Sequence, residues 1–230
     1  MQLTPRYDGP PVLQFVDPPD DLALPLGRQR RRLGKHLDGL DDDQWAAPSR
    51  CEGWSVRDVV AHLVGTDRFW TASVRAGLAG TPTRYLVGFD PVATPAAMVA
   101  GTRAQPAAEV LADYHEASEG LIGAVTALEP EQWAMAAEGP PGHLPLHAIV
   151  RHALWDAWIH ERDVAVPLGL DQEQHPDELT ACLEYAAALG PGLHAAVSPG
   201  RTGSLGVAAT DPDLELLVEL GESVVVSHGP

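Results

Sequence analysis

The stretch Arg151–Asp163, which reads RHALWDAWIHERD, decides how this chain is organised. It contains no Gly or Pro and predicts one helix that ends before Pro167. Residues four apart on a helix lie one turn above each other, with Cβ atoms roughly 5–6 Å apart. His152, Asp156 and His160 therefore form a polar ladder along one face of this helix.

This ladder has two interpretations. Its neighbours, among them Trp155 and Trp158, are large and apolar enough to be buried. Burying a carboxylate and two imidazoles without partners is costly, and a metal ion would satisfy all three groups. The alternative is a ladder that lies on a solvated face or is closed by ordinary hydrogen bonds. The spacing alone favours this alternative, so the rest of the chain has to decide.

The composition limits the class of protein. The chain has 230 residues, 45% of them apolar, which suffices for one large folded domain or for a domain with a smaller appendage. It carries 15 basic and 32 acidic residues, and the formal net charge of -17 disfavours binding to nucleic acid or to an anionic membrane surface. With no signal peptide and no membrane-spanning apolar run visible, we expect a cytoplasmic protein. Much Ala, Gly, Pro and Arg with little Lys indicates a GC-rich, actinobacterial genome.

Three parts are predicted along the chain. Residues 1–19 are Pro-rich and predict an extended N-terminal arm. Residues 20–171 predict a helical bundle, with loops at 79–95 and at 139–143. Residues 172–230 begin with one more helix and continue as three short β-branched runs, which predict an antiparallel meander in a small α+β domain. The predicted fold class is therefore mainly α.

A basic run lies on the first predicted helix of the bundle. We interpret it as a solvated helix face near the acidic residues 41–43, with an anionic ligand as the alternative. The run consists of Arg28, Arg30, Arg31, Arg32 and Lys35. Two acidic turns, DDDQW at 41–45 and EPEQW at 129–133, are similar in sequence. They predict two helix-to-loop connections of similar structure.

The second helix of the bundle begins at a clear signal. Ser55 followed by Asp58 predicts a capped N-terminus, and the helix then carries apolar residues as far as Trp70. His62 lies within this apolar stretch. It is either a core histidine whose ring nitrogens have ordinary hydrogen-bond partners or a third metal ligand. Cys51, in the loop before the helix, is interpreted as a packing residue rather than a catalytic one.

The loop and helix together resemble a known signature. The string CEGWSVRDVVAHL at residues 51–63 is similar to that of the mycothiol-dependent maleylpyruvate isomerase family, the actinobacterial branch of the DinB-like metal-binding four-helix bundles. The tail of the ladder helix resembles the family's second motif, in which an acidic residue is followed by His four positions later and Asp three after the His. The resemblance covers about residues 20–169, and the segment from about 175 resembles the start of the family's C-terminal domain.

Carried over to this chain, the resemblance implies a metal site. Its ligands would be His62, Asp156 and His160, with open positions for chemistry and zinc as the expected divalent metal. Asp163 would either orient a ligand or cap its own helix end, and His152 would add to the ligands or substitute for one. The departure is Asp156, because the family commonly has the longer Glu at that position.

The resemblance also implies a function. Family members use the metal to favour the ionised thiol of mycothiol, which is transferred to an electrophile or promotes a cis–trans isomerisation. We therefore expect a thiol-dependent isomerase or S-transferase that acts on a small molecule, as a monomer or homodimer. Family members usually continue with a further strand and an arginine-bearing helix that have no counterpart here, so we expect either a truncated chain or a different reaction or substrate. The alternatives are a non-catalytic DinB-like binding or stress-response module and a metal-dependent hydrolase.

Overall fold

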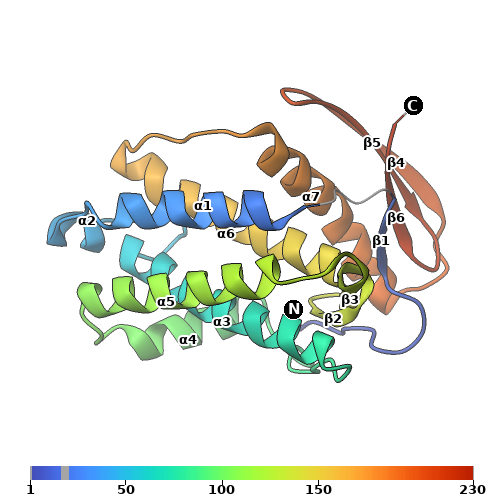
Figure 1. The fold of residues 1–230 in the computed structure, drawn as a ribbon, viewed down its shortest axis with the longest axis horizontal. Coiled ribbons are helices and arrows are strands. Elements are labelled where there is room, and N and C mark those ends of the chain that lie inside the picture. The colour runs from blue at the N-terminus through green and yellow to red at the C-terminus, as the bar shows by residue number, and fades with distance from the viewer. Residues whose placement is uncertain (1, 17–20, 230) are drawn as a thin grey trace.

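The computed structural model describes residues 2–16 and 21–229, and its elements run in the order short strand, helices, hairpin, helices and three further strands (Figure 1). The helices are α1 (Ala23–Leu37), α2 (Asp42–Ala46), α3 (Val56–Leu78), α4 (Ala93–Thr102), α5 (Ala107–Thr126), the 3-10 helix η1 (Pro130–Ala134), α6 (Leu146–Leu168) and α7 (Pro176–Val197). The strands are β1 (Leu13–Phe15), β2 (Ala136–Gly139), β3 (Gly142–Pro145), β4 (Gly203–Thr210), β5 (Asp213–Leu220) and β6 (Val224–His228). None of the described helices combines the length and apolarity needed to cross a bilayer.

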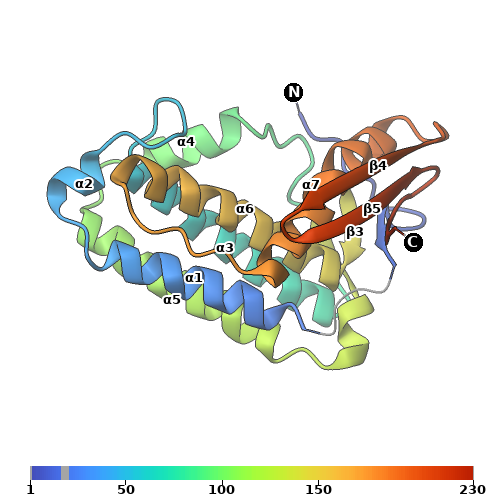
Figure 2. The same ribbon diagram turned by 90° about the horizontal axis from the view of Figure 1, so that it is seen from above.

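Four helices form the bundle. Helices α1 and α3 each pack against both α5 and α6, and α7 lies against α6 and against the strands (Figure 2). Buried apolar side chains such as Leu33, Val60 and Leu63 form one core at the α2 end, and a larger core continues toward the sheet. The prediction of a four-helix bundle followed by a small sheet region is confirmed.

Capping residues next to the helices determine where several of them begin. Ser55 Oγ accepts the Asp58 N–H, and the Asp58 carboxylate accepts the Ser55 N–H, so the predicted N-terminus of α3 is confirmed. The two echoing turns are also alike, because Asp41 with Gln44 and Glu129 with Gln132 each form the same reciprocal capping box.

Helix α6 is longer than predicted. It continues through Pro167 to Leu168 and ends at Gly169, whose φ of 66° is readily adopted only by glycine. Proline lacks the N–H that would bond the carbonyl four residues earlier, which belongs to Asp163. That carbonyl instead accepts the backbone N–H of Arg50 at 3.1 Å. The proline thus leaves an acceptor that ties the loop before α3 to the end of α6.

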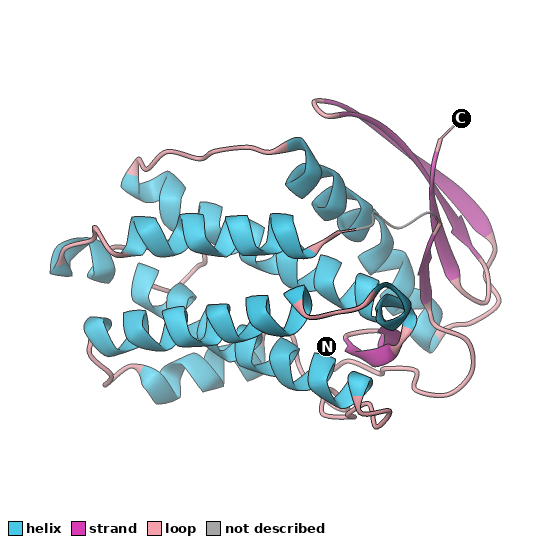
Figure 3. Cartoon of the chain, in the orientation of Figure 1, coloured by secondary structure: helices cyan, strands magenta, loops and turns pink. Residues whose placement is uncertain are grey.

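A four-stranded sheet stands at one end of the bundle, in the order β1-β6-β5-β4 (Figure 3). The three C-terminal strands form the predicted antiparallel meander, and β1 adds to it in parallel, with Leu13 opposite Val224. The N-terminal segment is therefore packed against the C-terminal strands. Residues 1 and 17–19 of the predicted arm, and residue 20 of the predicted bundle, lie outside the described residues. The division into 1–19, 20–171 and 172–230 stays a prediction.

The loop predicted at residues 139–143 is wrong, because most of it belongs to a hairpin of β2 and β3. Its Gly-Pro-Pro-Gly sequence forms the turn. Gly142 has a φ of 135°, and a Cβ there would lie only 1.8 Å from the Arg6 carbonyl oxygen. The glycine is needed for this close approach of two backbones.

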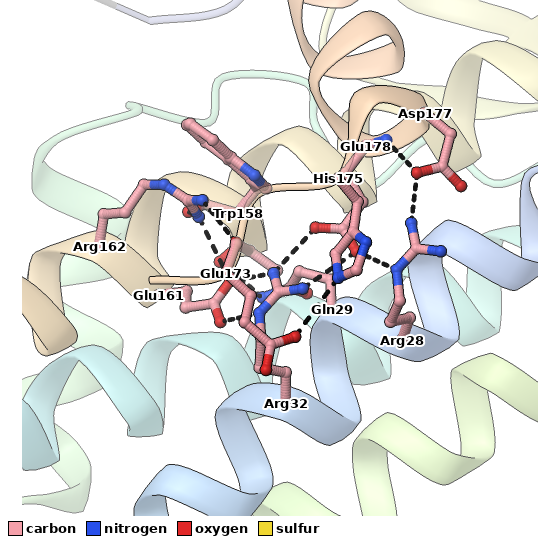
Figure 4. Close-up of polar contacts among 11 residues, drawn as sticks. Arg28, Gln29, Arg32, Trp158, Glu161, Arg162, Glu173, His175, Asp177 and Glu178 are labelled. Carbon is pink, nitrogen blue, oxygen red and sulfur yellow. Dashed lines mark hydrogen bonds and ion pairs between the residues drawn. The ribbon is translucent and has the colours of Figure 1, made fainter. Parts of the chain in front are cut away.

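The prediction that the basic run of α1 is solvated is wrong for its central residues. Arg30 is 1% exposed and is bound by Asp67 of α3. Arg32 is 7% exposed as a side chain and makes bonds of 2.7–3.1 Å to Glu161 of α6 and Glu178 of α7 (Figure 4). Buried arginines require such paired carboxylates, and these lie too far along the sequence to be recognised from the run itself.

Candidate metal centre

The candidate centre lies between α3 and α6, which pack directly against each other. His62 comes from α3, whereas Asp156 and His160 are one turn apart on α6. Asp156 Oδ2 lies 4.0 Å from His62 Nε2, and Asp156 Oδ1 lies 3.7 Å from His160 Nε2. The structure therefore brings together the three residues that the sequence assigned as ligands.

The three side chains are mostly buried but accessible, with exposures of 14–17%. Burial lowers the pKa of His62 and is only partly offset by the charge of Asp156, so this imidazole is neutral. Burial also disfavours charge on His160, but hydrogen bonds to Asp163 and Cys51 raise its pKa to about 10. In the metal-free chain His160 thus holds a proton that a bound cation would displace.

Asp163 fixes the orientation of His160. Its Oδ2 accepts from His160 Nδ1 at 3.0 Å, which leaves Nε2 turned to Asp156. A carboxylate behind a ligating histidine selects the tautomer and increases the basicity of the ligating nitrogen. Of the two roles expected for Asp163, this contact supports the orienting one.

The donor set fits a divalent metal. One ligand atom from each of His62, Asp156 and His160 lies within 4.8 Å of the other two. Two imidazole nitrogens and one carboxylate oxygen suit zinc and its first-row neighbours, and three protein ligands leave a position for a reacting molecule. The short side chain of Asp156 is adequate for this arrangement, since both of its oxygens face a histidine.

Cys51 lies behind the centre. It packs against the bundle core, as predicted, but its thiol also donates to Asp163 Oδ2 at 3.2 Å and lies 3.7 Å from His160 Nδ1. The Arg50 N–H bond to the carbonyl freed by Pro167 holds this loop in place. Cys51 therefore supports the carboxylate that orients His160.

His152 lies outside the ligand cluster. Its Nδ1 is 2.6 Å from the Tyr185 hydroxyl of α7, and its ring is surrounded by Trp70 and Trp155. Burial lowers the pKa of His152 to about 4. The ladder thus has two parts, the candidate ligands Asp156 and His160 and a neutral histidine bound to a tyrosine.

Sequence reasoning missed a buried pair next to the centre. Asp67, 1% exposed, accepts three bonds from Arg30 and one from Ser118. Its charge, together with that of Asp156, acts on His62. A carboxylate on the apolar face of α3 was the available signal, because such a group is rarely buried without a cation.

A four-helix bundle whose facing helices present two histidines and a carboxylate defines a candidate metalloprotein. The family model described as "Mycothiol maleylpyruvate isomerase N-terminal domain" matches residues 26–165, which contain all three candidate ligands. The chain belongs to this family.

Known proteins are similar to this chain in sequence or in fold. An uncharacterised protein of Mycobacterium tuberculosis, matched in two strains, is 32% identical over 137 residues, which is 57% of this chain and 50% of the relative. This chain thus spans about half the length of the curated relatives it matches. The crystal structure of the mycothiol-dependent maleylpyruvate isomerase aligns with a TM-score of 0.64 at 15% identity, over 91% of this chain and 84% of that one, and a histidine-to-alanine mutant of that enzyme aligns with a TM-score of 0.63. These structures show that the fold is shared.

Proposed function

We propose that this protein is a metal-dependent enzyme that uses a low-molecular-weight thiol such as mycothiol to isomerise, or to transfer the thiol to, a small electrophile. The observation that carries the proposal is the convergence of His62, Asp156 and His160 inside the bundle of a chain that belongs to this family. A divalent metal, with zinc as the expected ion, would act there as a Lewis acid that favours the ionised form of a thiol.

The chain's own residues supply the frame for this chemistry. His62 is neutral because it is buried, so a nitrogen lone pair is available without a proton being lost. Asp163 holds the Nδ1 proton of His160 and keeps Nε2 directed toward the centre. Cys51 donates to Asp163 and so prevents the carboxylate from turning away.

The proposal includes further expectations. The partners are a small-molecule substrate and a thiol, and the large negative charge gives no reason to expect nucleic acid or anionic membrane. A cytoplasmic location and a monomer or homodimer belong to the proposal as well.

The test compares turnover of a small electrophilic alkene by the zinc-loaded protein with and without added mycothiol. Turnover that requires the thiol, and is lost in Asp156→Ala together with the metal, supports the proposal. Turnover of the alkene without thiol contradicts the proposal, and cleavage of an ester or amide substrate by the zinc-loaded protein identifies a metal-dependent hydrolase instead. Stoichiometric metal with no turnover in either case identifies a non-catalytic binding module.

A further inference from the structure

Cys51 belongs to a second group of potential metal ligands, together with His160 and Asp163. One ligand atom from each of these residues lies within 4.8 Å of the other two, as in the candidate metal centre described above. The second group shares His160 with that centre but uses the opposite nitrogen of the ring. Nδ1 faces Cys51 and Asp163, whereas Nε2 faces Asp156. The same imidazole therefore lies between two sets of ligands.

The three atoms of the second group are spaced as ligands around a metal ion would be. Asp163 Oδ2 lies 3.0 Å from His160 Nδ1 and 3.2 Å from Cys51 Sγ, and the sulfur lies 3.7 Å from the same nitrogen. Metal–ligand bonds of about 2.0–2.3 Å at tetrahedral angles place the ligand atoms roughly 3.3–3.6 Å apart. An ion can therefore bind all three atoms after small movements of the side chains.

The backbone holds the three residues in these positions. His160 and Asp163 are three residues apart on α6 and so lie on the same face of the helix. Cys51 is in the loop before α3, where the Arg50 N–H donates to the Asp163 carbonyl at 3.1 Å. The Cys51 N–H itself donates to Ser49 Oγ at 3.1 Å. The sulfur is therefore kept next to the carboxylate by the structure of the loop.

An ion can reach this group from outside the bundle. Cys51 lines a surface hollow of about 310 Å³, together with Glu52 and Trp54. The side chains of His160 and Asp163 are 17% and 13% exposed. Glu52 is exposed and carries a negative charge, and the whole chain has a formal net charge of -17. Both charges favour the arrival of a cation.

The sulfur determines which cations the second group prefers. The first centre offers two nitrogens and one oxygen, whereas the second offers a sulfur, a nitrogen and an oxygen. Thiolate is a soft ligand and favours soft cations. Binding releases two protons to solvent, one from the Cys51 S–H group and one from His160 Nδ1–H, and the sulfur and nitrogen lone pairs form the bonds to the metal. The ring of His160 keeps its other proton on Nε2.

We propose that Cys51, His160 and Asp163 form a second metal site, which binds a soft, thiophilic cation and competes with the first site for His160. A cation on Nδ1 leaves the ring proton on Nε2, so zinc cannot bind that nitrogen at the same time. A soft cation therefore displaces zinc from the first site and stops the reaction proposed there. This inference goes beyond the proposed function, because it concerns a different ion at a different nitrogen and its readouts do not require turnover.

The test titrates the full, metal-free chain with Cd²⁺, a soft cation whose bond to a thiolate has an ultraviolet charge-transfer band. The chain has two cysteines, and Cys182 is 4% exposed and lies in neither ligand group found among the described residues. The band should therefore appear in the parent and in the control Cys182→Ala but not in Cys51→Ser. Serine can still donate to Asp163, so this variant replaces only the soft sulfur by a hard oxygen.

A second variant separates the two sites. His62→Ala lacks a ligand of the first site only, so it should lose zinc but keep the cadmium–thiolate band. Cys51→Ser should show the opposite pattern, with the zinc content of the parent and no band. The retained zinc also shows that Cys51→Ser is folded, so the loss of its band reports on the sulfur alone.

Competition between the sites is the third readout. Cd²⁺ added to the zinc-loaded parent should release zinc, measured by elemental analysis after gel filtration, and the same concentration should release less zinc from Cys51→Ser. The proposal is overturned if the parent shows no band, if the band persists in Cys51→Ser, or if it is lost in His62→Ala. Equal release of zinc from the parent and Cys51→Ser would overturn the competition for His160.

Discussion

The buried ion pairs of α1 allow a quantitative prediction about stability. Arg32 makes four hydrogen bonds of 2.7–3.1 Å to Glu161 and Glu178, whose side chains are 2% and 0% exposed. In Arg32→Met the apolar stem remains, but the two carboxylates lose the arginine that bridges them. Glu178 then keeps only its pair with Arg28, and Glu161 keeps only its contact with Arg162 at 3.3 Å. Breaking a buried pair in this way costs about 3–5 kcal/mol.

The expected effect is large enough to measure directly. For a domain of this size about 1 kcal/mol corresponds to roughly 2–4 °C in Tm, so Arg32→Met should lower Tm by on the order of 10 °C. The matched control is Arg31→Met, one residue earlier. Arg31 also pairs with a glutamate, Glu119, but both side chains are more than half exposed, and such a pair contributes about 0–1 kcal/mol.

Thermal and urea unfolding followed by circular dichroism would measure both variants. We expect a clear loss of unfolding free energy for Arg32→Met and almost none for Arg31→Met. If the two variants were equally stable, the bonds between α1, α6 and α7 shown in Figure 4 would not contribute to stability as argued. Restoring part of the loss by adding Glu161→Gln to Arg32→Met would confirm that an unpaired buried charge is the cause.

Three further predictions concern the centre and its surroundings. Asp163→Asn should weaken zinc binding about 10- to 100-fold, measured by competition with a chelator, because His160 loses its orienting carboxylate. In the metal-free protein the raised pKa of His160, about 10 against 6.5 unfolded, stabilises the fold fully below pH 6.5, and this contribution is lost as pH rises through about 10; urea unfolding across this range should show the loss, and Asp163→Asn should reduce it. Tyr185→Phe should cost about 1 kcal/mol by removing the bond to His152 yet leave the zinc content unchanged, and a loss of zinc would show that His152 belongs to the ligand set.

Most of the fold could be predicted because its signals are local. The capping residues Ser55 and Asp58, the helical spacing of apolar side chains and the alternation in the last three strands each depend on residues close together in the sequence. The ladder of Asp156 and His160 is likewise a property of one helix. The family motif then pointed to His62 on another helix, which the structure places beside them.

The features that were missed depend on distant partners. The basic run of α1 gives no sign that Asp67, Glu161 and Glu178 converge on it from three other helices. Pro167 in the sequence predicts a helix end, but the helix continues because the Arg50 N–H bonds the carbonyl that the proline leaves free. The pairing of β1 with β6 joins segments about 210 residues apart, with Leu13 opposite Val224. No local sequence pattern predicts this pairing.

The central claim is that His62, Asp156 and His160 hold one metal ion, and the most direct measurement is elemental analysis of the purified, zinc-exposed protein. Three proteins should be compared, namely the parent, His62→Ala and the control His115→Ala, whose imidazole is exposed and pairs with Asp38. The account predicts about one equivalent in the parent and the control and little in His62→Ala. No metal in the parent, or equal metal in all three, would contradict it.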